Sequence, residues 1–305
     1  MNEIVIFGEV LFDEFPDGNR VMGGAPFNVA WHLQGFGLAP VMISRVGRDE
    51  AGDAVLEAMR EWGMTIAGIQ RDPSHPTGRV QVVMQKDQPR FNIVPYQAYD
   101  YIDLDQAESL LAPLSPAILC HGTLAVRHNV SRRALGQLHR NHRVPAFLDI
   151  NLRSPWWEWG IVREWAGRAR WLKLNADELQ ILSHDTAPEH ASVAEKARRL
   201  RRNLAVEWLW VTLGREGAMV TGSDDFLAQE SPPPVTNLVD TVGAGDAFSA
   251  VALWGLLHDW PPGLTLQRAV EFAARMCEIQ GATTTDRELY RRQVAGWEKG
   301  ADGWK

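Results

Sequence analysis

The segment Asp240–Ala250, with the sequence DTVGAGDAFSA, combines residue types that would bind and transfer an anion. An apolar, strand-like stretch, Val235–Val239, precedes it, and a helical pattern of apolar residues follows. Its two glycines let the backbone turn tightly and let a ligand approach closely. The first turn of the helix would present unpaired backbone N–H groups and the positive end of the helix dipole. This combination predicts a site for an anion such as phosphate.

An acidic residue, Asp246, directly follows the Gly243-Ala244-Gly245 turn of this expected anion site. A phosphate-binding turn beside a carboxylate suggests phosphoryl transfer, in which Asp246 would accept the proton of an acceptor hydroxyl. The alternative is that Asp246 only caps the helix, as aspartate often does. A helix N-terminus lowers the pKa of a carboxyl group, whereas burial raises it, so these two effects on the pKa of Asp246 oppose each other.

Other well-known site motifs are missing from the sequence. No GxxxxGK[ST] pattern occurs, and Phe248 stands where the GxGxxG dinucleotide fingerprint requires its third glycine. The histidines lack the HExxH or paired-ligand spacing of zinc sites, and Ser249 is not in a GxSxG motif. These absences argue against a P-loop protein, a nicotinamide oxidoreductase, a zinc enzyme and a serine hydrolase.

The composition is that of an ordinary globular protein. The 305 residues are 45% hydrophobic and 23% charged, which allows a large core in one large domain or two smaller ones. The formal net charge is −7 and no basic stripe is evident, so nucleic acid is not an expected partner. Cys120 and Cys277 lie in apolar runs and are expected to be buried free thiols. The start of the chain lacks a leader pattern, and no apolar run approaches about 18 residues, so we expect a cytoplasmic protein without a membrane span.

Short apolar runs alternate with helical patterns along most of the chain, which predicts a parallel sheet covered by helices on both faces. The expected strands are residues 4–7, 41–46, 117–120, 146–150, 171–174 and 209–213. The expected helices are residues 26–36, 51–62, 131–141, 159–169, 177–183 and 191–204. Pro26 suits a first helical position, and Gly37 suits the end of that helix.

The segment Arg79–Val94 breaks this alternation, because its pattern is strand, turn and strand: RVQVVM, KDQP and RFNIV. No crossover helix fits between the two strands, so they are expected to be antiparallel. With Val10–Phe15 they would form a small separate sheet, which would serve as a lid over a substrate cleft. The predicted lid comprises residues 10–16 and 79–96, inserted in a single domain of residues 1–305.

Six short motifs, in order along the chain, resemble those of the ribokinase-like, or PfkB-type, carbohydrate kinases. They are GEVLFD (8–13), GGAPFNVA (23–30), DINLR (149–153), NADE (175–178), TLG followed by Gly217 (212–217) and DTVGAGDAF (240–248). Ile150 replaces the proline of the family's DPNxR motif, and Phe27 stands where fructokinases often carry a small residue. The resemblance runs from about residue 4 to residue 283. GGAPFNVA together with DINLR looks most like bacterial fructokinases.

The resemblance implies a three-layer α/β/α sandwich with a central, mostly parallel sheet and a small β-sheet lid. It also implies a sugar kinase that uses ATP and Mg²⁺ and transfers the γ-phosphoryl group to a sugar hydroxyl. Asp246 would be the general base, and the backbone N–H groups of Gly243, Ala244 and Gly245 would form the anion hole.

The resemblance assigns further motif residues to the substrates. Those implied for the sugar are Asp13, Gly23, Gly24, Asn28 and Arg153. Those implied for the nucleotide are Asn175, Thr212, Gly214 and Gly217. Glu178 would organise Mg²⁺ through water, and Asp240, together with the segment Cys277–Gly281, would hold K⁺ mostly through backbone oxygens. The structural alternatives are a helix cap for Asn175, simple turns for the glycines and a salt bridge for Arg153.

Fructose is the expected acceptor, because Asp13 and Asn28 suit a neutral polyol and no basic cluster surrounds them. The alternatives within the family are 2-keto-3-deoxygluconate kinase, ribokinase and a nucleoside kinase. Arg153 would favour the carboxylate of the keto acid. An alternative outside the enzymes is a non-catalytic protein of the same fold that senses a sugar or a nucleotide. The complete GAG loop and Asp246 argue against this alternative. The expected partners are therefore a sugar and ATP, and the lid leaves open a homodimer formed through it.

Overall fold

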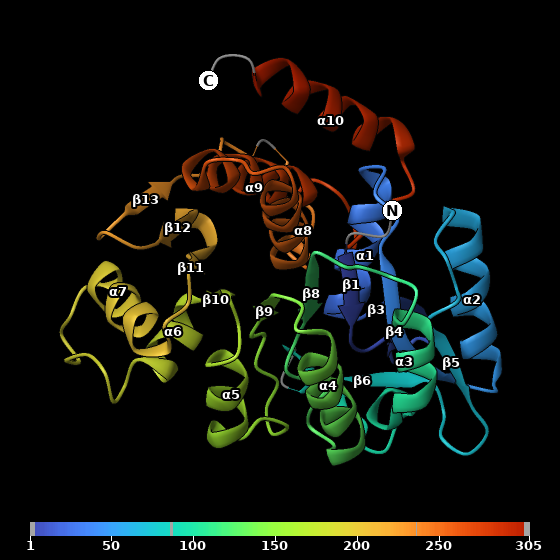
Figure 1. The fold of residues 1–305 in the computed structure, drawn as a ribbon. Coiled ribbons are helices and arrows are strands. Elements are labelled where there is room, and N and C mark those ends of the chain that lie inside the picture. The colour runs from blue at the N-terminus through green and yellow to red at the C-terminus, as the bar shows by residue number, and fades with distance from the viewer. Residues whose placement is uncertain (1–3, 86–87, 236, 302–305) are drawn as a thin grey trace.

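A large central sheet holds the molecule together in the computed structural model, which describes residues 4–85, 88–235 and 237–301 (Figure 1). The order of its strands is β13-β12-β11-β10-β9-β8-β1-β4-β5. Their bounds are β1 Ile4–Phe7, β4 Val41–Gly47, β5 Ile69–Asp72, β8 Ile118–His121, β9 Ala146–Asp149, β10 Trp171–Asn175, β11 Trp208–Thr212, β12 Ala218–Thr221 and β13 Leu227–Glu230. The pairs from β5 to β11 are parallel, and β12 and β13 are antiparallel additions at one edge.

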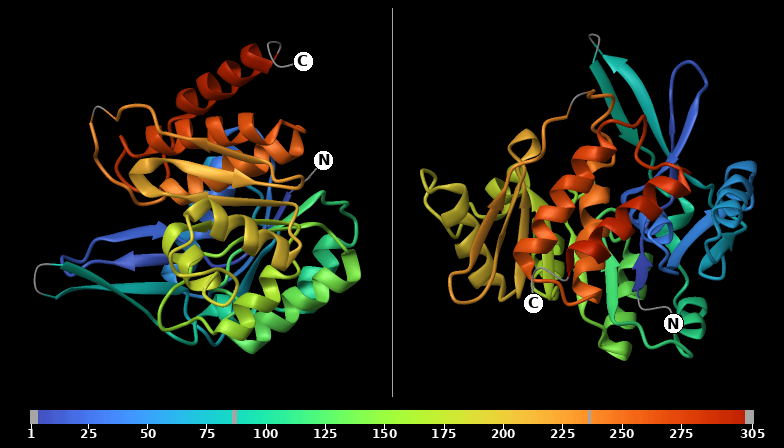
Figure 2. Two further views of the ribbon diagram at one scale, coloured as in Figure 1. Left: turned by 90° about the vertical axis from the view of Figure 1, so that its left-hand side faces the viewer. Right: turned by 90° about the horizontal axis from the view of Figure 1, so that it is seen from above.

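Helices cover both faces of this sheet, so the molecule has the expected three layers (Figures 1 and 2). One layer contains α1 Ala25–Gly35, α2 Glu50–Trp62, α8 Ala244–Leu257, α9 Pro262–Met276 and, outermost, α10 Arg287–Ala301. The other contains α3 Leu104–Leu111, α4 Asn129–His142, α5 Trp159–Ala166, α6 Ala176–Leu182 and α7 Val193–Leu204. Alternate residues of a strand face opposite layers: Ile4 and Ile6 belong to one buried cluster, and Val5 and Phe7 to the other.

A small second sheet projects from this body (Figure 2). Its strands, in the order β3-β2-β6-β7, are β2 Leu11–Glu14, β3 Arg20–Gly23, β6 Gly78–Gln85 and β7 Gln88–Ile93. The β6–β7 pair is antiparallel, as predicted, and β2 joins it by parallel pairing with β6. Part of the predicted KDQP turn, residues 86–87, lies outside the described residues. The prediction of a separate small sheet is confirmed, although β3 was not expected.

The predicted strand at Val235–Val239 is wrong. The described residues of this segment form no strand, and the last strand, β13, ends at Glu230. The prolines at 232–234 carry no backbone N–H group and disfavour sheet pairing. The N–H groups of Val239 and Asp240 instead donate to the carbonyl oxygen of Cys277, at 2.9 and 3.2 Å. The segment that leads into the GAG loop is therefore anchored to the end of α9.

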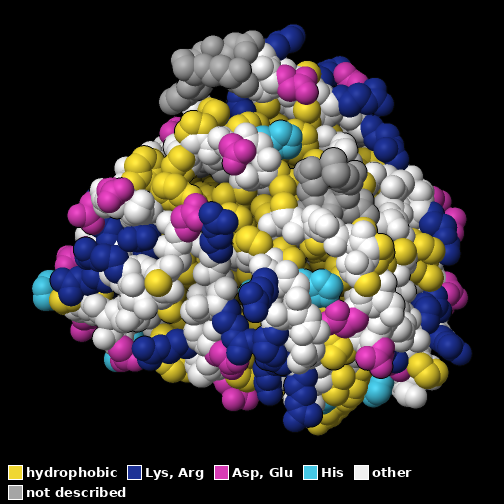
Figure 3. Space-filling model, in the orientation of Figure 1, with side chains coloured by type: hydrophobic (Ala, Val, Ile, Leu, Met, Phe, Trp, Pro, Cys, Tyr) yellow, Lys and Arg dark blue, Asp and Glu magenta, His cyan; other side chains and the backbone are white. Residues whose placement is uncertain are grey.

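Charged side chains are unevenly distributed over the surface. Figure 3 shows Lys and Arg gathered over the lower and left parts of the visible face, where α4, α5 and α7 lie. Some pair with carboxylates one helical turn away, such as Arg168 with Glu164 at 2.6 Å and Arg199 with Glu195 at 2.7 Å. Such pairs are typical of solvated helix faces.

The predictions about the two cysteines and about membrane-spanning helices can be compared with the structure. Both cysteines are free, but only Cys120 is buried, whereas Cys277 is half-buried at the end of α9. The expected burial of both thiols is therefore correct for one of them. Within the described part of the chain, no helix combines the length and apolar character needed to cross a bilayer.

Candidate active site

The predicted site residues gather at the carboxyl ends of the central strands, where open α/β sheets bind their ligands. Arg153 lies on the loop after β9, and Asn175 and Thr212 end β10 and β11 as paired residues of the ladder. Asp246 reaches this edge from the first turn of α8. The structure thus brings together motifs from both ends of the chain.

The GAG loop begins α8, as the sequence predicts. Gly243 caps the helix with φ of 80°, and a Cβ atom there would lie 2.4 Å from the Cα of Ala282, so only glycine fits. The helix starts at Ala244, and the N–H groups of its first turn have no acceptor within the helix. Residues Ala247–Gly255 are all buried, which holds the helix start rigidly. The geometry suits an anion hole, and this role remains a prediction.

Asp246 faces the sugar-motif helix α1. Asn28 of α1 donates from Nδ2 to Oδ2 of Asp246 at 2.7 Å, and the two helices pack side by side. Burial raises the pKa of Asp246 from its ordinary 3.8 to about 6; the Asn28 hydrogen bond lowers it, Asp149 raises it, and Lys173 and Arg153 lower it. Such a group is ionised at neutral pH yet more basic than an exposed aspartate, which suits a general base.

The predicted sugar residues meet where the small sheet joins α1. Gly24 caps α1 with φ of 114°, and a Cβ there would lie 2.7 Å from the carbonyl oxygen of Glu9. A Cβ on Gly23 would lie about 4 Å from the amide of Asn28, which is itself 5% exposed with Oδ1 unpartnered. Asp13 is half-buried on β2, and burial raises its pKa while Arg153 opposes this. Gly23 and Gly24 therefore lie against Asn28 and Glu9, and Arg153 acts on both Asp13 and Asp246; the joint binding of a sugar by these residues remains a prediction.

Arg153 lies exposed on the loop after β9. Its charge lowers the pKa of Glu9, Asp13 and Asp246, so the guanidinium lies near all three carboxyls. No ion pair involving Arg153 occurs among residues 4–85, 88–235 and 237–301, which gives no support to the structural salt bridge. Its contact with a substrate remains a prediction.

The nucleotide-side glycines form the turn between β11 and β12. Thr212 ends β11, and Gly214 and Gly217 adopt φ of 58° and 94°. A Cβ on Gly217 would collide with the carbonyl oxygen of Glu230, so this glycine is required by close packing. The conformation of the turn therefore explains why glycine stands at both positions. Contact of these glycines with a nucleotide remains a prediction.

Asn175 and Glu178 form a reciprocal cap at the start of α6. Asn175 Oδ1 accepts from the N–H of Glu178 at 2.9 Å, and Glu178 Oε2 accepts from the N–H of Asn175 at 2.8 Å. Glu178 Oε1 accepts from the N–H of Leu152 at 2.7 Å, so both oxygens of this buried carboxylate are engaged. Asn175 is therefore a helix cap, as the structural alternative expected. The role of Glu178 in Mg²⁺ binding remains a prediction.

The segments expected to hold K⁺ lie side by side. Asp240 accepts from the N–H of Val242 at 2.9 Å and from the N–H of Gly281 at 3.0 Å. This joins the loop before α8 to the segment Cys277–Gly281, as the resemblance implies. Across the part of the chain that the structure describes, no group of three or more His, Cys, Asp or Glu side chains could hold a metal by itself.

Sequence reasoning missed Glu9, although it belongs to the GEVLFD motif. Glu9 is 3% exposed, and its Oε2 has no hydrogen-bond partner. Burial raises its pKa from the ordinary 4.5 to about 7; Asp246 also raises it, whereas Arg153 and Arg127 lower it. The available signal was its position two residues after the wholly apolar strand Ile4–Phe7, at the carboxyl edge of a parallel sheet.

A second missed group forms a wall beside Glu9. Arg127 donates from Nε and Nη2 to the two carboxylate oxygens of Asp100, both at 2.8 Å, and lies over the rings of Tyr99 and Trp156. Tyr99 Oη and Arg127 Nη1 are buried without a partner. Nothing in the local sequence pattern pairs these residues, because Tyr99 and Asp100 lie far along the chain from Arg127 and Trp156.

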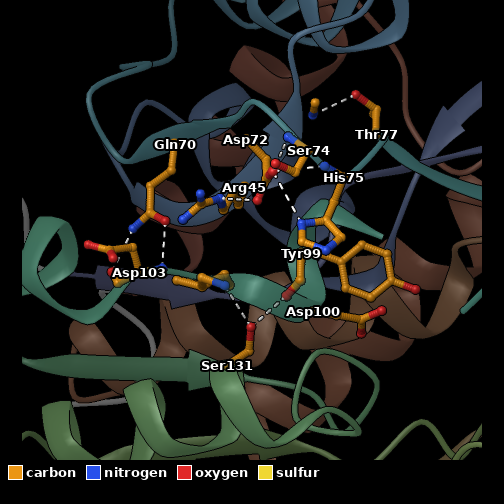
Figure 4. A network of polar contacts seen from close by, with 12 residues as sticks. Arg45, Gln70, Asp72, Ser74, His75, Thr77, Tyr99, Asp100, Asp103 and Ser131 are labelled. Carbon is orange, nitrogen blue, oxygen red and sulfur yellow. Dashed lines mark hydrogen bonds and ion pairs between the residues drawn. The ribbon is translucent and has the colours of Figure 1, made fainter. Parts of the chain in front are cut away.

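A polar network holds Tyr99 and Asp100 in place. They lie on the short helix η1, Ala98–Tyr101, and Ser131 Oγ donates to the carbonyl oxygen of Tyr99 at 2.7 Å and accepts from the N–H of Ile102 at 2.8 Å (Figure 4). Nearby, Arg45 Nε lies 2.7 Å from Asp72 Oδ2 (Figure 4). These contacts fix the backbone of η1, so we interpret the network as a support for the site wall.

Comparison with known proteins decides the family. The sequence model of one protein family, described as pfkB family carbohydrate kinase, matches residues 3–288 of this chain. The chain belongs to this family. Fructoselysine 6-kinase from Escherichia coli (strain K12) is 26% identical over 293 residues, covering 92% of this chain and 100% of that protein. Fructokinase-1 from Oryza sativa subsp. japonica is 27% identical over 307 residues, covering 93% and 92%.

A solved structure supports the same fold. The fructokinase from Xylella fastidiosa with bound ATP has a TM-score of 0.81 to this pfkB-family chain at 19% identity, covering 98% of this chain and 100% of that one. The predicted mixed α/β fold with a separate small sheet is confirmed. The relatives' names differ in their sugars, so membership in the pfkB family establishes a carbohydrate kinase without naming its acceptor.

Proposed function

We propose that this protein is an ATP-dependent kinase that phosphorylates a hydroxyl of a neutral sugar, with fructose as the first choice. The observation that carries the proposal is the 2.7 Å hydrogen bond from Asn28 to Asp246. It joins the sugar motif on α1 to the carboxylate beside the anion hole on α8. An acceptor hydroxyl bound by Asn28 would therefore lie near the proposed base.

The proposed reaction is a direct transfer. The acceptor oxygen bonds to the γ-phosphorus of ATP as the bond from that phosphorus to the β,γ-bridging oxygen breaks, and the hydroxyl proton passes to Asp246. A loose transition state needs little proton abstraction until late, so a base of pKa about 6 suffices. The N–H groups at the start of α8 would stabilise the charge on the transferred group.

The residues present fit Mg²⁺ through water rather than directly. Both oxygens of Glu178 accept backbone hydrogen bonds, and Asp149 is paired with Lys173. Mg²⁺ commonly keeps several waters and is held largely by substrate phosphates, whose charge it neutralises when bound. We expect Glu178 to orient such waters.

We also propose K⁺ beside Asp240, since that residue joins the loop before α8 to the segment Cys277–Gly281. Turnover measured in K⁺ and in a buffer of a bulky organic cation tests this. Higher turnover in K⁺ is expected, and equal turnover would remove K⁺ from the proposal. The free thiols support a proposed cytoplasmic location.

The charges around the pocket favour a neutral acceptor over an acidic one. Three carboxyls, those of Glu9, Asp13 and Asp246, lie near Arg153, whereas the guanidinium of Arg127 beside Glu9 is already paired with Asp100. An acidic sugar would have to compete with these groups for Arg153. This balance supports fructose over 2-keto-3-deoxygluconate.

The test is an ADP-release assay with ATP and a panel of fructose, ribose, 2-keto-3-deoxygluconate and adenosine. Fructose should have the highest kcat/KM, and Asp246→Asn should lower kcat by about 10²–10⁴ without loss of ATP binding. Asp105→Asn is the matched control, since Asp105 is an exposed acid in the first turn of α3, outside the motifs.

The panel separates the alternatives. A preference for the keto acid would contradict the fructose assignment and make Arg153 the residue to substitute. Binding of sugar or ATP without any turnover would identify a sensor. Near-normal turnover by folded Asp246→Asn would show that Asp246 is not the base.

A further inference from the structure

A buried lysine lies behind the proposed anion hole, outside the residues assigned so far. Lys173 of β10 is 6% exposed, and its Nζ donates to Oδ1 and Oδ2 of Asp149 at 3.0 and 2.9 Å. Ser249 of α8 donates from Oγ to Asp149 Oδ2 at 2.7 Å. The three side chains form one network that joins the end of β9 and the middle of β10 to α8.

This network touches the anion-hole loop itself. A Cβ built on Gly245 would lie 3.1 Å from Lys173 Nζ, so the ammonium group lies against the first turn of α8. Ser249 Oγ also lies 3.1 Å from the carbonyl oxygen of Gly245. The glycine therefore admits a positive charge directly behind the N–H groups that would receive the phosphoryl group.

The charge is retained despite its burial. Burial lowers the pKa of Lys173, but Asp149, Asp246 and Glu178 raise it above its ordinary value, so the side chain remains a cation. A buried ion pair contributes little net stability compared with apolar residues of similar volume. Stability alone is therefore a poor reason for an ammonium group at this place.

We propose that Lys173, held by Asp149 and Ser249, is a positioning residue that fixes the first turn of α8 and places a positive charge behind the anion hole. The proposal rests on the proposed kinase function. As negative charge accumulates on the equatorial oxygens of the transferred group, Lys173 would stabilise it through Gly245 without contacting the substrate. Its charge would also keep the neighbouring Asp246 ionised.

Lys173→Met removes the charge and keeps the length of the side chain. We expect kcat to fall by about tenfold to a hundredfold at its pH plateau and ATP affinity to fall by about tenfold, with little change in the KM for the sugar. The midpoint of the acid limb of kcat should move to higher pH, because Lys173 no longer lowers the pKa of Asp246. The other groups acting on Asp246 are unchanged: Asn28, Asp149, Arg153, Glu9 and the thiol of Cys120.

Two further variants keep the test decisive. Lys196→Met removes another buried lysine, whose Nζ donates to Gln180 on α6, and it should leave kcat and its pH profile unchanged. If Lys173→Met does not fold, Lys173→Met with Asp149→Leu avoids leaving an unpaired buried carboxylate. That double variant should fold and still show reduced kcat and reduced ATP affinity.

Loss of thermal stability with wild-type kcat, pH profile and ATP affinity would show a purely structural role and overturn the proposal. If the wild-type protein phosphorylates no sugar, the proposed function fails instead. Calorimetric titration with ATP then still decides the role of Lys173, because unchanged affinity in Lys173→Met would overturn it and weaker affinity would support it.

Discussion

Glu9 allows a quantitative test of the electrostatics beneath the sugar site. Its carboxyl is 3% exposed, one oxygen has no partner, and burial raises its pKa from 4.5 to about 7. A group whose pKa is raised by folding stabilises the fold below its unfolded pKa, and this contribution is lost as the pH rises through the folded pKa. One pH unit is worth about 1.4 kcal/mol, so ionisation of Glu9 should lower the free energy of unfolding by about 3 kcal/mol above pH 7.

Glu9→Gln removes this titration and keeps the shape of the side chain. The free energy of unfolding of the variant, minus that of the wild type, should increase by about 2–3 kcal/mol between pH 5 and pH 8. Urea unfolding followed by tryptophan fluorescence at several pH values measures this difference. Any constant effect of a changed hydrogen bond is already present at pH 5 and therefore cancels.

Glu216→Gln is the matched control, because Glu216 is exposed in the turn after β11. Its difference from the wild type should not depend on pH. The reasoning about Glu9 is refuted if the Glu9→Gln difference also stays constant from pH 5 to pH 8. Glu9 would then titrate near its ordinary pKa, and its burial would have to be compensated by groups that the structure does not show.

Three further predictions concern the site and the small sheet. Because burial raises the pKa of Asp246 to about 6, kcat/KM should fall about tenfold between pH 7 and pH 5, and a limb centred near pH 4 would contradict this. Asn28→Ala and Asp13→Ala should each weaken sugar binding by roughly 1–3 kcal/mol in calorimetric titration, and an effect on ATP alone would mean that the sugar and nucleotide sites are misplaced. Hydrogen exchange across residues 79–94 should slow when sugar binds, whereas equal protection would identify a fixed sheet instead of a lid.

The sequence determined the layered fold because parallel strands buried on both faces are continuous apolar runs. Ile4–Phe7 is such a run, and the structure forms β1 over the same residues. Helix ends were also predictable where glycine supplies the required φ, as at Gly63 after α2. The same criterion failed at Val235–Val239, because apolar character does not show whether a neighbouring strand is available for pairing.

The resemblance in the sequence also predicted Asn28, Asp246 and the GAG loop as site residues. Only the tertiary structure decided their neighbours. Asn28 and Asp246 are 218 positions apart, and Ser249 and Asp149 are 100 apart, so no local periodicity connects either pair. Burial, which raises the pKa of Glu9, and the position of Lys173 behind Gly245 depend on how separate strands and helices pack, and that packing is a property of the folded chain as a whole.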